Sequence, residues 1–252
     1  MIKVVILGAG NVATHLFKAF QKSDKVMVVQ WFNRDLEKLI PFNNEVGITN
    51  GISDLESADV YFISVTDDAI SEISEALPFE DRLVVHTSGT VNIHDLDKKN
   101  RRGVFYPLQT FSKSVDIDFK KVPICLETIE KDDYKLLKTA ADSISDFVKK
   151  VNSDQRAALH LGAVFVNNFV NQLYRLAHEI TESTGAEFDM LKPLILETAL
   201  KVQDNSPFRA QTGPALRGDK STIKAHLKRL QNEHHKDIYE ILTQSIKNTH
   251  GR

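Results

Sequence analysis

The sequence predicts an α/β domain followed by an all-helical domain, and three observations support this. A continuous apolar run, Ile2 to Leu7, passes directly into Gly8-Ala9-Gly10-Asn11-Val12-Ala13 and a helical pattern. Strand-like and helix-like segments then alternate as far as residue 151. From Ser153 onward no strand-like run appears. We therefore expect two domains, at 1–152 and 153–252.

The opening stretch has the pattern of a dinucleotide-binding turn. A short apolar run is typical of a strand buried on both faces, and it leads through two glycines into a helix. Gly8 would allow the tight turn, Gly10 would let the backbone approach a pyrophosphate, and Ala13 would let helix and strand pack closely. The phosphates would lie at the helix N-terminus, beside Asn11 and Val12. Glycine pairs also occur in ordinary turns, but the strand–turn–helix context favours a nucleotide site.

The end of the second predicted strand, 26–32, indicates which dinucleotide binds. In this kind of fold an acidic residue at that position suits a free ribose 2′-hydroxyl, whereas arginine suits a 2′-phosphate. Asn33 and Arg34 stand there, followed by Asp35. A solvated loop is the alternative, and Asp35 could still approach a ribose hydroxyl. We expect NADP(H) in preference to NAD.

The next strand, 59–65, ends in small and acidic residues. Ser64, Val65 and Thr66 would face the ligand at the carboxyl edge of the sheet. The same stretch, Thr66 to Asp68, could simply cap the helix predicted over 69–77. We therefore expect these residues to be neighbours of the cofactor and not catalysts.

The strand at 82–85 delivers His86, Thr87, Ser88 and Gly89 to that same edge, where the nicotinamide should lie. Ser88 and the backbone of Gly89 could form hydrogen bonds with a carboxylate or carbonyl of a substrate, although Thr-Ser-Gly turns are also common in ordinary loops. Further strands are predicted at 103–106, 122–126 and 147–151, with a helix over 132–145. The loop at 107–111 could line one side of the ligand-binding crevice at this edge.

Composition excludes several classes of function. The net charge of −2 provides no electrostatic footprint for nucleic acid, and no apolar run is long enough to span a membrane. The start of the chain enters a core strand without a secretory pattern, so we expect a cytoplasmic protein. Cys125, the single cysteine, lies in an apolar segment and is expected to be a buried thiol. No Cys/His spacing indicates a metal site.

The second half is predicted to contain helices at about 153–184, 187–203 and 220–247. Between Ala157 and Gln172 the first of these has no charged residue, and its apolar side chains cover most of the circumference, which predicts a helix buried nearly all round. About a hundred residues of helix can scarcely cover it alone, so we expect a homodimer formed largely by this domain.

A polar row interrupts this helix. At 100° per residue, His160, Asn167, Asn171 and His178 fall in one narrow sector. These side chains could hydrogen-bond within a helical core. Alternatively they line a substrate cleft, with His160 as proton donor, Asn167 or Asn168 orienting the substrate and Asn171 beside it.

The loop from Ser206 to Asp219 is punctuated by glycine and proline. Asp219 can cap the last helix. Arg217 either belongs to an ordinary loop or holds this loop against a substrate cleft.

These motifs together resemble the family of Rossmann-like NADP oxidoreductases that carry a C-terminal domain of unknown function. The resemblance covers the whole chain and is specific at the Thr-Gly-Pro-x-x-Arg-Gly-Asp loop, Thr212 to Asp219. More distantly, the chain is similar to pyrroline-5-carboxylate reductases, ketopantoate reductases, deazaflavin-dependent NADP reductases and β-hydroxyacid dehydrogenases. The wider resemblance implies dimerisation through the helical domain and a substrate cleft between domains.

The sequence departs from the β-hydroxyacid dehydrogenases at one position. In that family a catalytic lysine precedes an asparagine pair, and if Asn167-Asn168 is that pair, Val164 stands in place of the lysine. Either His160 substitutes for it, or the reaction is one that needs less acid assistance, such as imine reduction.

We therefore expect an NADPH-dependent oxidoreductase that transfers a hydride between nicotinamide and a small carbonyl or imine substrate. The alternatives are a non-catalytic dinucleotide-binding sensor or assembly protein, and an enzyme like the deazaflavin-dependent NADP reductases. A methyltransferase also opens with a glycine-rich turn, but the Asn33-Arg34 strand end and the trailing helices count against it.

Overall fold

The computed structural model describes residues 1–112 and 115–251. The chain divides into two compact units, Met1–Asn167 and Asn168–Arg252. The division falls inside the helical run that begins at Ser153. The assignment of separate nucleotide and dimerisation domains at 152/153 stays a prediction.

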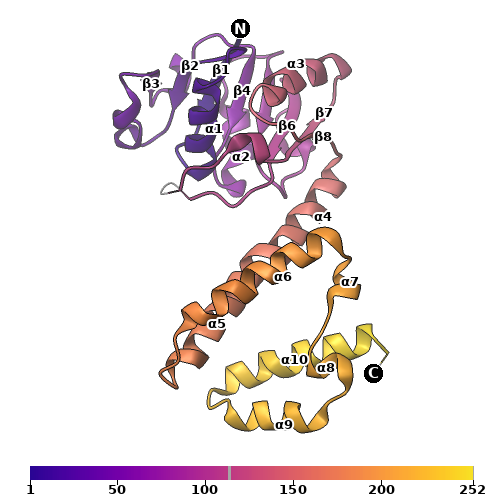
Figure 1. Cartoon of the computed structure of the whole chain (residues 1–252). Coiled ribbons are helices and arrows are strands. Elements are labelled where there is room, and N and C mark those ends of the chain that lie inside the picture. Colours follow the sequence, from indigo (N-terminus) through magenta and orange to yellow (C-terminus); the bar gives the residue numbers. More distant parts are fainter. Residues whose placement is uncertain (113–114, 252) are drawn as a thin grey trace. The chain divides into compact units, whose positions relative to one another are not determined.

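The first unit is an α/β structure with one sheet. Its described residues form eight strands in the order β3-β2-β1-β4-β5-β6-β7-β8 (Figure 1). The strands are β1 (Ile2–Leu7), β2 (Val26–Phe32), β3 (Gly47–Thr49), β4 (Val60–Ile63), β5 (Leu83–His86), β6 (Arg101–Pro107), β7 (Ile124–Thr128) and β8 (Val148–Lys150). The helices are α1 (Asn11–Gln21), α2 (Ile70–Ala76), α3 (Lys131–Asp142) and α4 (Ser153–Ala163).

Strands β1 to β6 are parallel to one another, and β7 runs antiparallel to β6. The order 3-2-1-4-5-6 is the doubly wound arrangement of dinucleotide-binding domains, so the predicted fold class is confirmed. The chain reverses its direction of travel across the sheet between β1 and β4. In such sheets the ligand crevice opens at this switch point, at the carboxyl ends of the strands.

Side-chain alternation along the strands fills both faces of the sheet. Val4 and Ile6 of β1 pack in one cluster with Leu16 of α1 and Leu137 of α3. Their neighbours on β1, Val5 and Leu7, belong to a second cluster that includes Ile70 of α2. Burial on both faces explains why these strands are continuous apolar runs.

Several elements differ from the prediction, among them the loop from Ser206 to Asp219, which contains the short helices Pro207–Ala210 and Pro214–Arg217. Strand β3 lies between the predicted strands 26–32 and 59–65, where no strand was predicted; it pairs with β2 through only three residues and leaves no apolar run in the sequence. The helix expected over 220–247 is wrong, because it is broken into α9 (Lys220–Arg229) and α10 (Glu233–Thr249). Asn232 stops the pattern, since its side chain accepts a hydrogen bond from the His234 N–H and starts a new helix.

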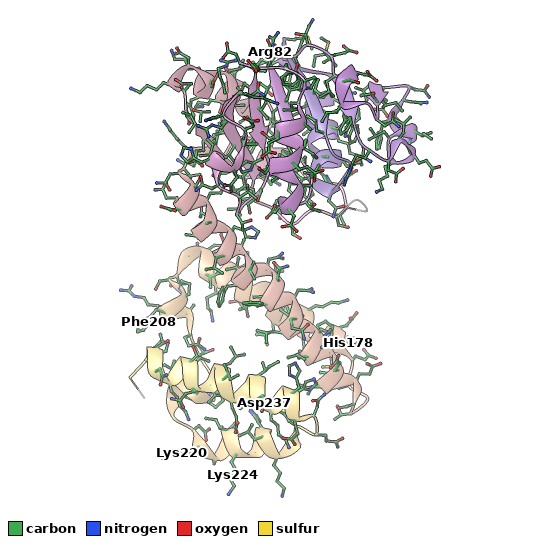
Figure 2. The ribbon with its side chains drawn as sticks, turned by 180° about the vertical axis from the view of Figure 1, so that it is seen from behind. Arg82, His178, Phe208, Lys220, Lys224 and Asp237 are labelled. Carbon is green, nitrogen blue, oxygen red and sulfur yellow. The ribbon has the colours of Figure 1, made fainter. Side chains whose placement is uncertain are left out.

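The second unit is helical. Its helices are α5 (Val170–Glu182), α6 (Lys192–Asp204), α7 (Pro207–Ala210), α8 (Pro214–Arg217), α9 and α10. Asp219 caps α9 as predicted, with its carboxylate accepting from the Thr222 N–H at 3.0 Å. Lys220 and Lys224 of α9 are exposed, and Figure 2 shows their side chains extending from the helix. Among the described residues no helix is long and apolar enough to cross a bilayer.

Candidate functional site

A cleft of about 690 Å³ lies at the carboxyl edge of the sheet in the first unit. Every residue that lines it belongs to Met1–Asn167. The structure brings together here all eleven residues predicted to bind the cofactor: Gly8, Gly10, Asn11, Val12, Asn33, Arg34, Ser64, Val65, Thr66, Ser88 and Gly89. The predicted proton donor, His160, lines the same cleft.

The glycine turn is shaped to receive an anion. Gly8 has φ +113°, and a Cβ there would lie 2.1 Å from the Ser64 carbonyl oxygen, so only glycine fits. At Gly10 a Cβ would meet no atom within 4 Å, which leaves open space beside the backbone. Gly10 also precedes α1, and no side chain caps this helix. The first N–H groups of α1 and its positive dipole end therefore suit a phosphate.

Two cationic side chains lie at the end of β2. Arg34 and Lys38 both line the cleft and are exposed, and Arg34 makes no ion pair with any described residue. Asp35 does not line the cleft, because its carboxylate accepts from the Glu37 N–H and pairs with Lys38 at 3.4 Å. This end of the cleft thus favours an anionic group over a free ribose hydroxyl.

At the other side, His160 and Tyr106 form a pair. The Tyr106 hydroxyl lies 3.0 Å from His160 Nδ1, and both residues line the cleft. Gly89 permits this approach: a Cβ there would lie 2.6 Å from His160 Nδ1 and 2.9 Å from Tyr106 Cζ. We call His160, Tyr106 and Gly89 the reaction-end cluster.

Tyr106 was not predicted as a site residue. It lies near the end of β6, so the rule that placed Ser88 at a strand end could have identified it. Burial raises the pKa of Tyr106 to about 12, with nearby Cys125 acting in the same direction and the charge of Arg156 opposing it. The phenol therefore stays protonated near neutral pH.

The Ser88 hydroxyl, which was predicted to bind substrate, already makes hydrogen bonds within its own loop. Its Oγ accepts from the N–H groups of Thr90 and Val91, each at 3.1 Å, and contacts Thr90 Oγ1 at 3.3 Å. Thr90 Oγ1 in turn donates to Asp67. The Ser88 hydroxyl thus shapes the 88–91 loop, while the adjoining backbone lines the cleft.

The alternative of helix capping at Thr66 to Asp68 is wrong. No side chain caps the short 3₁₀ turn Asp67–Ala69 or the following α2. The Asp67 carboxylate instead accepts from Thr90, which joins the strand ends of β4 and β5. Next to them, His86 is fully buried, and burial lowers its pKa to about 3, with Arg156 acting in the same direction.

Residues Val164–Phe169 are π-helical, so the regular 100° spacing assumed for the predicted polar row does not hold within this segment. The row extends from the first unit into the second, and it stays a prediction. Asn167 is exposed and does not line the cleft. Asn168, Asn171 and Arg217 are exposed residues of the second unit, and their contact with substrate stays a prediction.

The expectation of a helix buried nearly all round is wrong for the single chain. Leu161 is 60% exposed and Val166 is 75% exposed. In α6, Leu194 and Leu196 are 62% and 60% exposed. The apolar sequence of these helices is therefore not explained by burial within one chain.

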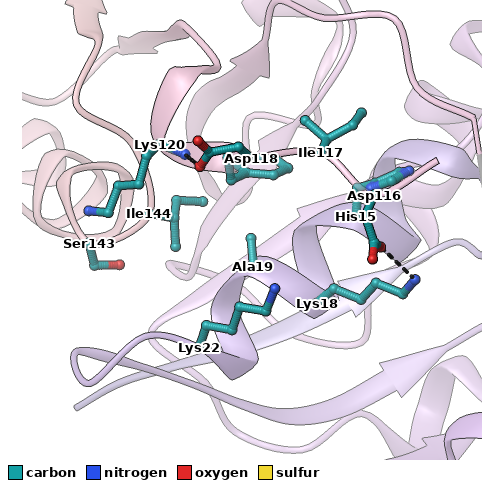
Figure 3. Close-up of a pocket in the computed structure, with 11 residues that line it drawn as sticks. His15, Lys18, Ala19, Lys22, Asp116, Ile117, Asp118, Lys120, Ser143 and Ile144 are labelled. Atoms are coloured by element: carbon teal, nitrogen blue, oxygen red, sulfur yellow. Dashed lines mark hydrogen bonds and ion pairs between the residues drawn. The ribbon is translucent and has the colours of Figure 1, made fainter.

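A second hollow, of about 410 Å³, lies between α1, the 116–120 segment and the end of α3 (Figure 3). Lys18, Lys22 and Lys120 line it, but Lys18 lies 3.8 Å from Asp116 and Lys120 lies 3.5 Å from Asp146. None of the predicted site residues lines this hollow. In residues 1–112 and 115–251, no three metal-binding side chains gather.

Comparisons with known proteins agree with this geometry. Residues 3–89 match the family "NADP oxidoreductase coenzyme F420-dependent", and residues 122–246 match the domain of unknown function DUF2520. None of the curated proteins is significantly similar to the chain.

Among solved structures, a "putative NADP oxidoreductase" from Bacteroides fragilis is 37% identical, with 100% of this chain and 98% of that chain covered and a TM-score of 0.87. A protein from Thermotoga maritima is 20% identical over 99% and 100% of the two chains, with a TM-score of 0.79. An imine reductase from Myxococcus stipitatus, in complex with NADP+, is 15% identical over 99% and 96%, with a TM-score of 0.67, and shares the fold. The chain therefore belongs to the NADP oxidoreductase family in which a nucleotide-binding domain is followed by DUF2520.

Proposed function

We propose that this protein is an NADPH-dependent reductase of a small molecule with a C=N or C=O bond. One observation carries the proposal: a single cleft holds an anion-binding glycine turn, a basic strand end and an ionisable His–Tyr pair. The basic end follows β2 and the pair includes Tyr106 of β6, which is four strand spacings away. This separation, about 19 Å, suits an extended dinucleotide.

The residues of the cleft fit such a cofactor. The N-terminus of α1 would bind the pyrophosphate, and Arg34 with Lys38 would bind a 2′-phosphate. When bound, the dinucleotide supplies a hydride equivalent from its nicotinamide. The preference for NADPH over NADH is part of the proposal and is supported by the position of Asp35 outside the cleft lining.

His160 would supply the proton. Tyr106 engages Nδ1, so Nε2 of the imidazolium is the nitrogen left to release a proton to the substrate nitrogen or oxygen. The substrate thereby gains one hydride at carbon and one proton at the heteroatom, and His160 becomes neutral. A protonated imine already carries that proton, which reduces the demand on His160 and suits a chain with Val164 at the lysine position of related dehydrogenases.

An imine is therefore the substrate class that we favour within this proposal. The Myxococcus stipitatus imine reductase shares the fold and binds NADP+. The coenzyme F420 family matches only residues 3–89, so it supports the dinucleotide site and leaves the second substrate open. A cytoplasmic location stays a prediction.

We infer further that the functional form is a homodimer. Many large apolar side chains between residues 159 and 202 are exposed in the single chain, among them Leu161, Val166, Leu194 and Leu196, and covering them in a dimer would remove apolar surface from water. Residues Asn168, Asn171 and Arg217 are proposed to contact the substrate from the helical unit.

The test is the variant His160→Asn, assayed with a panel of small imines and keto acids. We expect an intact fold and NADPH affinity, with turnover reduced by roughly 10² to 10⁴, the usual contribution of a positioned acid. His15→Asn is a matched control, because His15 is buried in the same unit but bonds Ser112 O and does not line the cleft. It should lower the melting temperature without a comparable rate loss.

Two outcomes would contradict the proposal. If His160→Asn mainly lowers the melting temperature, with an unchanged rate, His160 is a structural residue. If wild type binds NADPH but consumes none with any substrate of the panel, the non-catalytic sensor becomes the better explanation.

A further inference from the structure

Arg156 is a fully buried arginine in the first turns of α4. Its Nη1 donates to Glu127 of β7, and its Nη2 donates to the Val91 carbonyl and, at 3.2 Å, to Ser153 Oγ. One guanidinium therefore joins a strand, a loop and a helix of the first unit.

Glu127 completes this junction. Its carboxylate accepts from the Ser153 N–H and the Ser153 hydroxyl, each at 2.9 Å. Ser153 Oγ also accepts from the Ile93 N–H at 3.3 Å. The start of α4 is thus fixed to β7 and to the 91–93 loop by directional hydrogen bonds. We call Arg156, Glu127 and Ser153 the anchor.

Each group that the anchor joins lies close to a member of the reaction-end cluster, either in sequence or through strand pairing. Arg156 and His160 are four residues apart on α4 and so share one face of the helix. Val91 follows Gly89 by two residues. Glu127 pairs with Val104 of β6, and the register places Tyr106 two residues further along that strand.

Stability alone is a weak explanation for this arrangement. A buried ion pair contributes little more than well-packed apolar residues would, because desolvation offsets the attraction. The planar guanidinium group, in contrast, donates its hydrogen bonds in fixed directions and so fixes the relative positions of its partners. Arg156 also provides the charge that opposes the burial-driven rise in the pKa of Tyr106.

We propose that the Arg156–Glu127 pair is a positioning device, which holds α4, β7 and the 88–93 loop at one point and thereby sets His160 against Tyr106 and Gly89. The inference rests on the proposed function for its catalytic consequence. Its structural consequence can be measured without a substrate.

The experiment compares Arg156→Lys and Glu127→Gln with Asp133→Asn. The Arg101–Asp133 pair is a matched control: the nitrogen–oxygen distance is 2.6 Å, Asp133 is 2% exposed, and Arg101 lies at the opposite end of β6. The readout is the imidazole ¹⁵N NMR signal of His160, identified by its loss in His160→Asn. Tyr106→Phe supplies the signal expected when the Nδ1 hydrogen bond is lost.

We expect all three charge variants to lower the melting temperature by several degrees. In Arg156→Lys and Glu127→Gln the His160 signal should move toward that of Tyr106→Phe, whereas in Asp133→Asn it should stay at the wild-type position. With a substrate in hand, Arg156→Lys should reduce kcat by roughly 10- to 100-fold. KM and the NADPH Kd should stay within about threefold.

A His160 signal that keeps its wild-type position in Arg156→Lys and Glu127→Gln overturns the positioning role, whatever the enzyme turns over. If Arg156→Lys does not fold, Glu127→Gln decides, because it keeps an oxygen acceptor for Ser153. A shifted signal in a protein without turnover supports the anchor and contradicts the reductase assignment only.

Discussion

Replacing Gly89 by alanine would test the geometry of the reaction-end cluster. Gly89 is not among the described glycines with positive φ, so alanine is compatible with its backbone. The added Cβ would lie 2.6 Å from His160 Nδ1, whereas ordinary van der Waals contact begins at 3.4 Å. The imidazole and the new methyl group must therefore separate by about 0.8 Å. The Tyr106–His160 hydrogen bond, now 3.0 Å, would then exceed hydrogen-bonding distance or lose its alignment.

Misplacement by about 1 Å can cost a factor of roughly 10² in rate, so we expect Gly89→Ala to lower kcat by about 10- to 100-fold. Overpacking should also cost about 1 to 3 kcal/mol of unfolding free energy. Steady-state kinetics and urea denaturation measure both effects. Gly162→Ala is the control, because a Cβ there meets no atom within 4 Å and alanine favours the helix.

A Gly89→Ala protein with wild-type kcat and wild-type stability would refute the reasoning. It would mean that His160 can move away from Gly89 at no cost, so its observed position could not be a requirement for catalysis.

Three other measurements address separate parts of the molecule. NADPH should bind more tightly than NADH by roughly 1.5 to 3 kcal/mol, and Arg34→Ala should remove the preference, because only the 2′-phosphate can accept a charge-assisted bond from Arg34; equal wild-type affinities in a titration would contradict this. Light scattering at micromolar concentration should show a dimer that Val166→Glu weakens, since Val166 is 75% exposed in one chain; a monomer of 28.4 kDa would be the opposite result. Between pH 7 and pH 5, wild type should lose about 2 kcal/mol more unfolding free energy than His86→Asn. The pKa of His86 in the folded protein is about 3, below its unfolded value, so protons bind first to the unfolded chain and stability decreases as the pH decreases. If unfolding free energy depends on pH in the same way in wild type and His86→Asn, His86 does not cause this loss.

Most of the first unit could be predicted because buried parallel strands leave a plain signal. β1, β4 and β5 are rich in apolar residues, and the glycine turn after β1 identifies the switch point. Strand β3 left no such signal, because Gly47–Thr49 is short and half-exposed. The residues predicted to bind the cofactor could also be identified, because ligands of such sheets bind at the carboxyl ends of the parallel strands, and the sequence shows where those strands end.

The reaction-end cluster could be predicted only in part. His160 was identified from the composition of its helix, but its contact with Tyr106 depends on how α4 packs against the sheet, which no local pattern specifies. The π-helical segment Val164–Phe169 was not predicted either, because a change of hydrogen-bond register has no signature in hydrophobic periodicity. Arg156 was missed because a buried charge is recognised only through its distant partner, Glu127.

The most direct test of the central claim is a crystal structure of the protein with NADPH bound. We expect the pyrophosphate at the N-terminus of α1, the 2′-phosphate beside Arg34, and the nicotinamide next to the reaction-end cluster, with room for a substrate atom about 3 to 3.5 Å from His160 Nε2. NADPH bound outside this cleft, or a nicotinamide directed away from His160 and Tyr106, would contradict the account.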